Sequence, residues 1–263
     1  MHGLLMIPSR HWLLAMLSLA LAIASQSVHA GVIIDGTRQI YPEQRREVTV
    51  RVTNDDKLAP RLVQAWVDAG DSREAPELSD APFVLSPPVF RLDAGKSQAM
   101  RLSYTKAALP TDKESLFWLN VLEVPGSDSE FDPSLEESQR NHLKFAFRIR
   151  TKVFFRPAQL AGKPEEAPDL LHWSVHRVAQ NNVIRVHNPS AYHVTFNDVD
   201  LLMGQRADAQ KLALEPSMVP PGETLTLEVP KAVREIPADA RVSFTYINDF
   251  GGFSTAQPAL LGR

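Results

Sequence analysis

The segment LKFAFRIRTKVFFRP, residues 143–157, is the part of this sequence that decides the fold. Large apolar residues alternate with cations along it, and successive side chains of a strand point to opposite faces. The alternation therefore predicts one long β-strand over residues 143–155. One face of that strand would carry Leu143, Phe145, Phe147 and Ile149, and the other Lys144, Ala146, Arg148, Arg150 and Lys152.

The pattern alone leaves two interpretations of this strand open. It fits an ordinary half-buried strand of a β-sandwich, with one apolar and one polar face. It also fits a strand that extends the sheet of a partner, because backbone pairing tolerates many sequences and alternate apolar side chains can fill a partner's pockets. In the second case, phenylalanine would contribute most of the buried area.

Short β-rich runs separated by turn residues occupy the rest of the chain. With the long strand, seven runs are expected in the first part, at residues 32–34, 46–53, 62–67, 89–92, 99–104, 116–124 and 143–155. Such a number and spacing are typical of an immunoglobulin-like sandwich. The same pattern returns later, at residues 171–178, 183–188, 193–202, 224–229 and 241–247.

A segment rich in proline and small residues, 157–168, separates the two groups of runs and fits an interdomain connection. Twenty prolines in the chain argue against long helices. We therefore expect an all-β protein with two immunoglobulin-like β-sandwich domains. Residues 31–157 would form the first domain, 158–163 the linker and 164–263 the second domain.

The first 30 residues are typical of a secretory signal peptide. Arg10 and His11 precede an apolar run, residues 12–24, that is shorter than the roughly 20 residues of a membrane span. Small residues at Val28 and Ala30 suit a signal peptidase, so we expect cleavage after Ala30, with an uncleaved N-terminal anchor as the alternative. No later segment is apolar enough to cross a bilayer, so the mature protein is expected to be soluble, without stable membrane insertion.

Composition restricts the possible partners. The chain has 28 Lys and Arg against 31 Asp and Glu, a formal net charge of -3, and the predicted cleavage would remove one cation and no acid. An acidic total does not favour nucleic acid as a partner. The cations between Arg148 and Arg156 are nevertheless concentrated enough to form a local anion site. The absence of cysteine excludes disulfides, thiol redox chemistry and thiolate metal ligands.

We find no sequence pattern for catalysis. His172 and His176 have metal-like spacing, but the accompanying Glu is missing and the local pattern is that of a strand. Nucleophile elbows, phosphate-binding glycine loops and dinucleotide fingerprints are also absent. We therefore expect no enzyme, no metal, no nucleotide and no other cofactor. The acidic segment 126–141 is expected to be a solvated mobile loop before the long strand.

Several ordered blocks of the sequence resemble the periplasmic chaperones of the chaperone/usher pathway, which assemble pili. The resemblance covers nearly the whole mature chain. Its blocks are DGTR at 35–38, early in the first predicted strand, VTND at 52–55, QAW at 64–66, SPPVFRL at 86–92, ESLFW at 114–118, KVFFRP at 152–157 and YINDFGG at 246–252.

The resemblance implies both a fold and a set of site residues. Two immunoglobulin-like domains would form a boomerang, and the long strand would be lent to a pilus subunit, or pilin, that lacks its own last strand. The implied donor residues are Leu143, Phe145, Phe147 and Ile149. Arg38 and Lys152 would anchor the C-terminal carboxylate of the subunit, and Glu114, Arg156 and Asp249 would form an interdomain charge cluster. Strict alternation puts Lys152 on the face opposite Leu143, so a twist or bulge is expected to aim it into the cleft.

The implied function is to bind, fold and cap pilins and to deliver them to an outer-membrane usher, with a self-capping oligomer when the chaperone is free. Some members of the family have a disulfide in the second domain, and this chain differs from them because it has no cysteine. The loop at 125–141 resembles that of the short-loop class of these chaperones more than that of the long-loop class. The rival interpretation is a secreted two-domain structural or adhesive protein that self-associates. An exported hydrolase would need a clustered catalytic set, which the sequence does not show.

Overall fold

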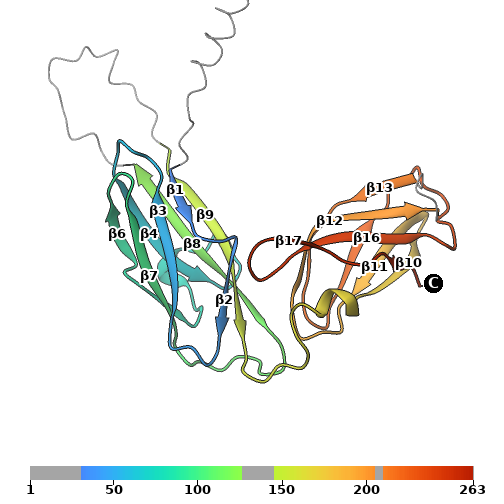
Figure 1. The fold of residues 1–263 in the computed structure, drawn as a ribbon, viewed down its shortest axis with the longest axis horizontal. Coiled ribbons are helices and arrows are strands. Elements are labelled where there is room, and N and C mark those ends of the chain that lie inside the picture. Colours follow the sequence, from blue (N-terminus) through green and yellow to red (C-terminus); the bar gives the residue numbers. More distant parts are fainter. Residues whose placement is uncertain (1–30, 126–144, 205–209, 263) are drawn as a thin grey trace, which may run out of the picture.

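The computed structural model describes residues 31–125, 145–204 and 210–262. Two β-rich domains meet at an angle, and the segment between β9 (Phe147–Arg156) and β10 (His172–Val178) joins them (Figure 1). Within these described ranges, helix is limited to short 3-10 turns such as η1 (Pro76–Leu78) and η3 (Ala167–Leu170), and none is long enough to cross a membrane. The expected all-β fold with two immunoglobulin-like sandwiches is confirmed.

The first domain is a sandwich of two sheets. One sheet has the order β1-β3-β7-β5, and all its pairs are antiparallel. The other has the order β2-β9-β8-β4-β6, in which only β2 and β9 are parallel. The bounds not yet given are β1 (Val32–Ile34), β2 (Arg38–Pro42), β3 (Val48–Asn54), β4 (Arg61–Asp68), β5 (Phe83–Ser86), β6 (Val89–Leu92), β7 (Ser97–Tyr104) and β8 (Ser115–Pro125).

Alternate residues of these strands fill the core of the first domain. Val63, Met100, Leu119 and Val153 are fully buried, each on a different strand. Tyr41 is buried as well, and its ring stacks on Phe155 with centroids 6.1 Å apart. The inward face of β9 is therefore a structural part of this core from about Ile149 onward.

The second domain is also a sandwich. Its sheets have the orders β10-β11-β15 and β13-β12-β16-β17, with β14 added to β12 and β18 to β16. The rings of Trp173, Phe196 and Phe244 pack together at its centre. The remaining bounds are β11 (Asn181–His187), β12 (Val194–Met203), β13 (Gln210–Leu214), β14 (Met218–Val219), β15 (Thr224–Glu228), β16 (Arg241–Ile247), β17 (Phe253–Thr255) and β18 (Ala259–Leu260).

The structure corrects the predicted start of the long strand. β9 begins at Phe147, and the two residues before it, Phe145 and Ala146, are not in a strand. Leu143 and Lys144 lie outside the described residues, as does the predicted loop at 126–141. Predicted strand 143–155 is therefore too long at its N-terminal end by at least these two residues.

The DGTR block at 35–38 was wrongly placed in the first strand. Gly36 has a φ of +80°, in the left-handed region that favours glycine, and a turn separates β1 from β2 there. β1 pairs with β3 in one sheet, whereas β2 pairs with β9 in the other. The turn thus moves the chain between the sheets, and Arg38 becomes the first residue of β2.

Leu160 lies within the expected linker, residues 158–163, and packs against the core of the second domain. Ala167 in η3 is buried in the same core. The connection between the domains is therefore held partly against the second sandwich.

Candidate functional site

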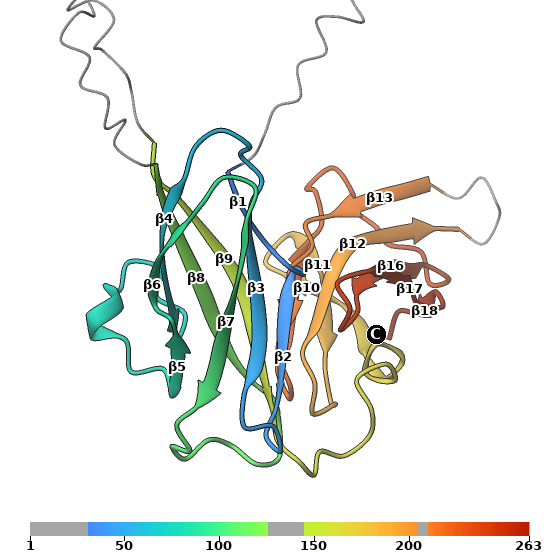
Figure 2. The ribbon, with the colours of Figure 1, turned by 60° about the vertical axis from the view of Figure 1, so that its left-hand side comes forward.

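The edge of β9 is only partly paired. On one side, β8 pairs with it from Glu123 opposite Phe147 to Ser115 opposite Phe155. On the other side, β2 covers it only from Lys152 onward, so Phe147–Thr151 has no strand on that edge within the described residues. Figure 2 shows that β2 is a short strand confined to the lower half of the first domain in this view. An open edge of this kind can pair with another chain.

The predicted donor residues differ in their exposure. Phe145 and Phe147 are 58% and 57% exposed, and their ring centroids lie 6.2 Å apart. Ile149 is half-buried and packs against the core of the first domain. Leu143 lies outside the described residues. Two large aromatic side chains thus stand exposed beside the open edge.

Arg38 and Lys152 are placed side by side as the first pair of the parallel β2–β9 ladder. Arg38 is 9% exposed, its Nη1 donates to the carbonyl oxygen of Ile247 at 2.8 Å, and its buried Nε has no hydrogen-bond partner. Lys152 Nζ lies 5.4 Å from the centroid of the Trp118 ring and makes no ion pair with any described residue. Both cations retain capacity to bind an anion.

Burial disfavours the charge on both side chains. It lowers the pKa of Arg38, although Asp249 and Glu114 act in the opposite direction. It also lowers the pKa of Lys152, and the positive charge of Arg38 lowers it further. A carboxylate placed between the two would relieve this repulsion and supply the missing hydrogen-bond acceptor.

The bulge expected near Lys152 is not found. The register of β9 with β8 and with β2 runs without a shift. Lys152 shares the outward face of β9 with Phe154 and Arg156, and those two residues line the space between the domains. The bulge is not needed because the cleft lies on the outer face of the sheet, so simple alternation already turns Lys152 toward that side; the alternative of a twist stays untested.

The cleft between the domains has a volume of about 480 Å³. Arg38, Phe154 and Arg156 line it from the first domain, and Tyr246 and Phe250 line it from the second. Lys152 is not among its lining residues. Phe250 is 96% exposed, on a turn in which the Asn248 side chain accepts hydrogen bonds from the Phe250 and Gly252 amides.

Arg156 connects the two domains through both predicted acidic partners. Its Nε and Nη2 lie 2.8 and 2.7 Å from Glu114 Oε1, and its Nη1 lies 2.7 Å from Asp249 Oδ2. Burial alone lowers the pKa of Arg156, but the hydrogen bonds and charges of Asp249 and Glu114 raise it above its ordinary value. The structure thus brings Glu114, Arg156 and Asp249 into one network.

Glu114 also contacts the second domain directly. Its Oε2 accepts hydrogen bonds from the backbone N–H of His193 at 2.8 Å and from His193 Nδ1 at 3.2 Å. Its own N–H donates to the carbonyl oxygen of Ala191, and the Arg156 guanidinium lies over the ring of Tyr192. The sequence did not indicate His193, Tyr192 or Ile247 as site residues. Several of the contacts at the site use backbone atoms, which any residue type can supply, so they produce no recognisable sequence motif.

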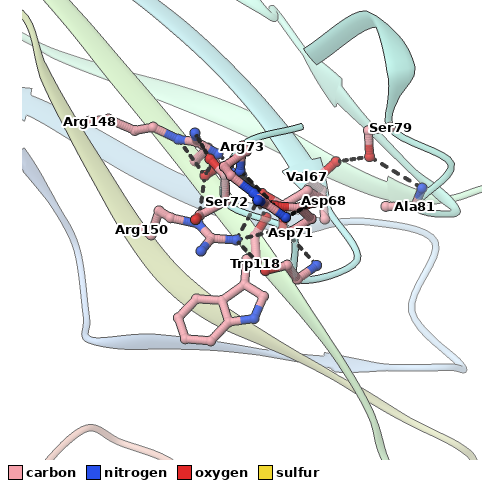
Figure 3. A network of polar contacts seen from close by, with 12 residues as sticks. Val67, Asp68, Asp71, Ser72, Arg73, Ser79, Ala81, Trp118, Arg148 and Arg150 are labelled. Atoms are coloured by element: carbon pink, nitrogen blue, oxygen red, sulfur yellow. Dashed lines mark hydrogen bonds and ion pairs between the residues drawn. The ribbon is translucent and has the colours of Figure 1, made fainter. Parts of the chain in front are cut away.

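A second network, shown in Figure 3, binds the cations Arg148 and Arg150 of β9. Asp68 is fully buried, and its carboxylate lies 3.2 Å from Arg148 and 2.7 Å from Arg150. Asn120 Oδ1 accepts from both guanidinium groups, which lie over Trp66 and Trp118. Arg148 and Arg150 therefore share one carboxylate, whereas Arg38 and Lys152 form no ion pair among the described residues.

The histidine pair considered for metal binding is not part of a metal-like cluster. His172 lies opposite His187 in the β10–β11 ladder, and His176 Nε2 is 3.0 Å from Ser174 Oγ. No group of three or more His, Cys, Asp or Glu side chains suited to a metal ion occurs in the described part of the chain.

Comparisons with known proteins identify the family. The family described as "Pili and flagellar-assembly chaperone, PapD N-terminal domain" matches residues 31–161, and "Pili assembly chaperone PapD, C-terminal domain" matches residues 166–258. The chain is 38% identical over 234 residues to the "Probable fimbrial chaperone YadV" of Escherichia coli K12, covering 88% of this chain and 90% of that one. It is 33% identical over 248 residues to "Chaperone protein FimB/FhaD" of Bordetella pertussis, covering 91% and 92%.

Solved structures agree with these relatives. The crystal structure of the YadV chaperone matches with a TM-score of 0.72 at 36% identity, over 88% of this chain and all of that chain. The SafB chaperone of Salmonella enterica, solved in complex with the SafA pilin, matches with a TM-score of 0.63 at 27% identity, over 89% and 97%. This chain therefore belongs to the PapD family of pili assembly chaperones.

Proposed function

We propose that this chaperone acts in the periplasm, where it binds a pilin, completes its sheet with β9, prevents premature polymerisation and delivers it to an outer-membrane usher. The related SafB was solved in complex with a pilin, which supports a pilin as the partner here. The mechanism uses strand pairing and one anion site, so it requires neither a nucleotide nor a metal.

The main support for this proposal is the unpaired edge of β9, which ends at the point where Arg38 of β2 pairs with Lys152. A partner strand on the edge of Phe147–Thr151 would occupy the position that β2 occupies further along. It must stop where β2 begins, which is at Arg38. A chain that ends there would place its C-terminal carboxylate beside two cations that form no ion pair among the described residues, and charge-assisted hydrogen bonds of this type are strong and directional.

The exposed aromatic residues would supply the apolar part of binding. Burial of a large apolar side chain is worth roughly 1.5–3 kcal/mol, and Phe145 and Phe147 are more than half exposed. We propose that these two residues, with Leu143 and Ile149, fill the groove of the subunit. Ile149 contributes less new burial because it already packs against the chaperone's own core.

We assign the interdomain network a positioning role. Glu114, Arg156 and Asp249 would fix the angle between the domains and therefore the width of the cleft beside Arg38. Such a buried network contributes specificity of arrangement more than net stability, because desolvation of the charges offsets much of their attraction.

The remaining parts of the proposal concern processing and assembly. Residues 1–30 would be removed after Ala30 during export to the periplasm, and residues 31–157 and 164–263 would be the two domains, with 158–163 as linker. We propose that the free chaperone caps its own open edge in an oligomer and that it belongs to the short-loop class. The rival, a self-associating structural protein, is not favoured because the relatives are chaperones.

Co-purification from the periplasm tests the proposal. The mature wild-type protein is compared with Lys152→Ala and with Lys96→Ala, a matched control at an exposed lysine of the same domain, and mass spectrometry identifies the bound proteins. We expect a pilin with the wild type and the control, and none with Lys152→Ala. Equal recovery from all three would refute the anchor, and self-association without any pilin would refute the chaperone mechanism.

A further inference from the structure

Glu123 is a buried acid outside the site described above. It is 5% exposed and lies on the inward face of β8, opposite Val63 of β4 and Phe147 of β9. Its Oε2 accepts a hydrogen bond from the Val32 N–H at 2.5 Å. No cation pairs with it in the described ranges, and Arg61, the basic residue of β4 on the same side, is paired with Asp56 at 2.7 Å.

A buried carboxylate at this position has no positive charge to offset the free-energy cost of its removal from water. Withdrawal of a charge from water is strongly unfavourable unless the charge is paired, and one neutral N–H donor supplies only part of what water supplied. The described structure therefore leaves this buried position without the positive charge that a carboxylate requires.

Gly31 lies directly against this carboxylate. A methyl group added at Gly31 would come within 2.7 Å of all three atoms of the Glu123 carboxyl group, so a larger residue would require that carboxyl group to move. The glycine nitrogen is about 2.5 Å from the position of that methyl, and hence no more than about 5 Å from the carboxyl group. The Gly31 carbonyl oxygen accepts from the Asp55 N–H at 3.0 Å, which holds the residue in place.

We infer that Glu123 is the binding site for the α-ammonium group that removal of residues 1–30 creates on Gly31. The inference rests on the export step of the proposed function. Hydrolysis of the Ala30–Gly31 bond adds one water and leaves a carboxylate on Ala30 and an ammonium group on Gly31. Before cleavage the Gly31 nitrogen is a neutral amide, and afterwards it is a cation within about 5 Å of a buried anion.

This ion pair would join the two sheets at the start of the open edge. Val32, next to Gly31, pairs with β3 in one sheet, whereas Glu123 belongs to β8 in the other and lies opposite Phe147. Processing would therefore stabilise the end of the sandwich from which the lent strand emerges.

A thermodynamic cycle tests the pairing in the purified chaperone without any subunit. The chain beginning at Gly31 is prepared with a free and with an acetylated Gly31 amine, each with Glu123 and with Glu123→Gln, which retains a hydrogen-bond acceptor for Val32. Acetylation restores the neutral amide of the unprocessed chain. We expect it to raise the unfolding constant about tenfold with Glu123, or about 1.4 kcal/mol, and less than twofold with Glu123→Gln.

The pKa of the Gly31 amine gives a second readout, and its value in the wild type is informative by itself if the variant does not fold. An opposite charge raises the pKa of an amine, so we expect a value above the ordinary 7.7–8.0 or so in the wild type and a return to it in Glu123→Gln. Other charged groups on the surrounding elements are Asp55, Asp56, Lys57, Arg61, Asp93 and Lys96, and they are identical in both proteins.

Three results would overturn the inference. These are an equal effect of acetylation in both backgrounds, an ordinary pKa of the amine in the wild type, and an intact mass of the exported protein that shows a first residue other than Gly31. None of these measurements includes a pilin, so failure of the chaperone mechanism would be seen separately, in the co-purification experiment.

Discussion

Replacement of Arg156 by Met should destabilise the free chaperone by about 3–5 kcal/mol, the range for removal of one partner from a buried ion pair. The cause is Glu114, whose side chain is only 2% exposed and would lose its cation while His193 alone continued to donate to it. Asp249 is 33% exposed and can be rehydrated. Its pairing should therefore contribute about 1 kcal/mol or less, as for pairs near the surface.

The same reasoning predicts how a second substitution behaves. Glu114→Gln in the Arg156→Met background removes the uncompensated anion and should recover much of the lost stability, although each single substitution is destabilising. Asp249→Asn should be nearly neutral.

Urea unfolding of the four purified variants and the wild type measures these differences. The reasoning is refuted if Asp249→Asn is as destabilising as Arg156→Met, or if the double variant is no more stable than Arg156→Met alone.

Three further predictions concern the binding edge and the cleft. Lys152→Met should weaken pilin binding about 10- to 150-fold, by loss of about 1.5–3 kcal/mol from a charged hydrogen bond. This substitution should not lower the melting temperature, because burial lowers the pKa of Lys152 and the charge of Lys152 therefore disfavours folding. For the same reason, the folding stability of the wild type, but not of the variant, should increase as the pH rises from below that lowered pKa toward 10.5. Phe147→Ser should reduce pilin affinity but leave the stability of the free protein unchanged, since the ring is 57% exposed; a large drop in melting temperature would contradict this. Gly251→Ala should destabilise the domain contact by more than about 1 kcal/mol, because the φ of Gly251 is +81° and the new methyl group would lie 2.8 Å from Thr37 Oγ1. An unchanged domain angle in small-angle scattering, together with unchanged stability, would show that this prediction is wrong.

Much of the first domain was predictable because its strands carry local signals. The alternation around Ile149 and Val153 and the turn residues between runs identify the long strand and its neighbours. β2 was missed because its partner β9 lies more than a hundred residues further along the chain, and a short parallel strand has no local pattern of its own. β5 and the short strands β13, β14, β17 and β18 were missed as well.

The site was harder to predict than the fold, since its charges are balanced by distant residues. Asp68 pairs with both Arg148 and Arg150 from about 80 positions away, which no spacing rule reveals. The direction of Lys152 depended on where the second domain lies, because the outward face of β9 becomes a wall of the cleft only in the assembled molecule. The family blocks indicated which residues to consider, and the structure supplied their partners.

Hydrogen exchange along β9 is the decisive test of whether this strand pairs with a pilin. The amides of Phe147 to Thr151 that do not bond to β8 are compared in the free monomeric chaperone and in its complex with a pilin. We expect these amides to exchange rapidly in the free protein and to become strongly protected in the complex, with new protection that ends at Lys152, where β2 already covers the edge. Unchanged exchange at these amides in a stable complex would contradict this expectation, because the pilin would then be held by another surface.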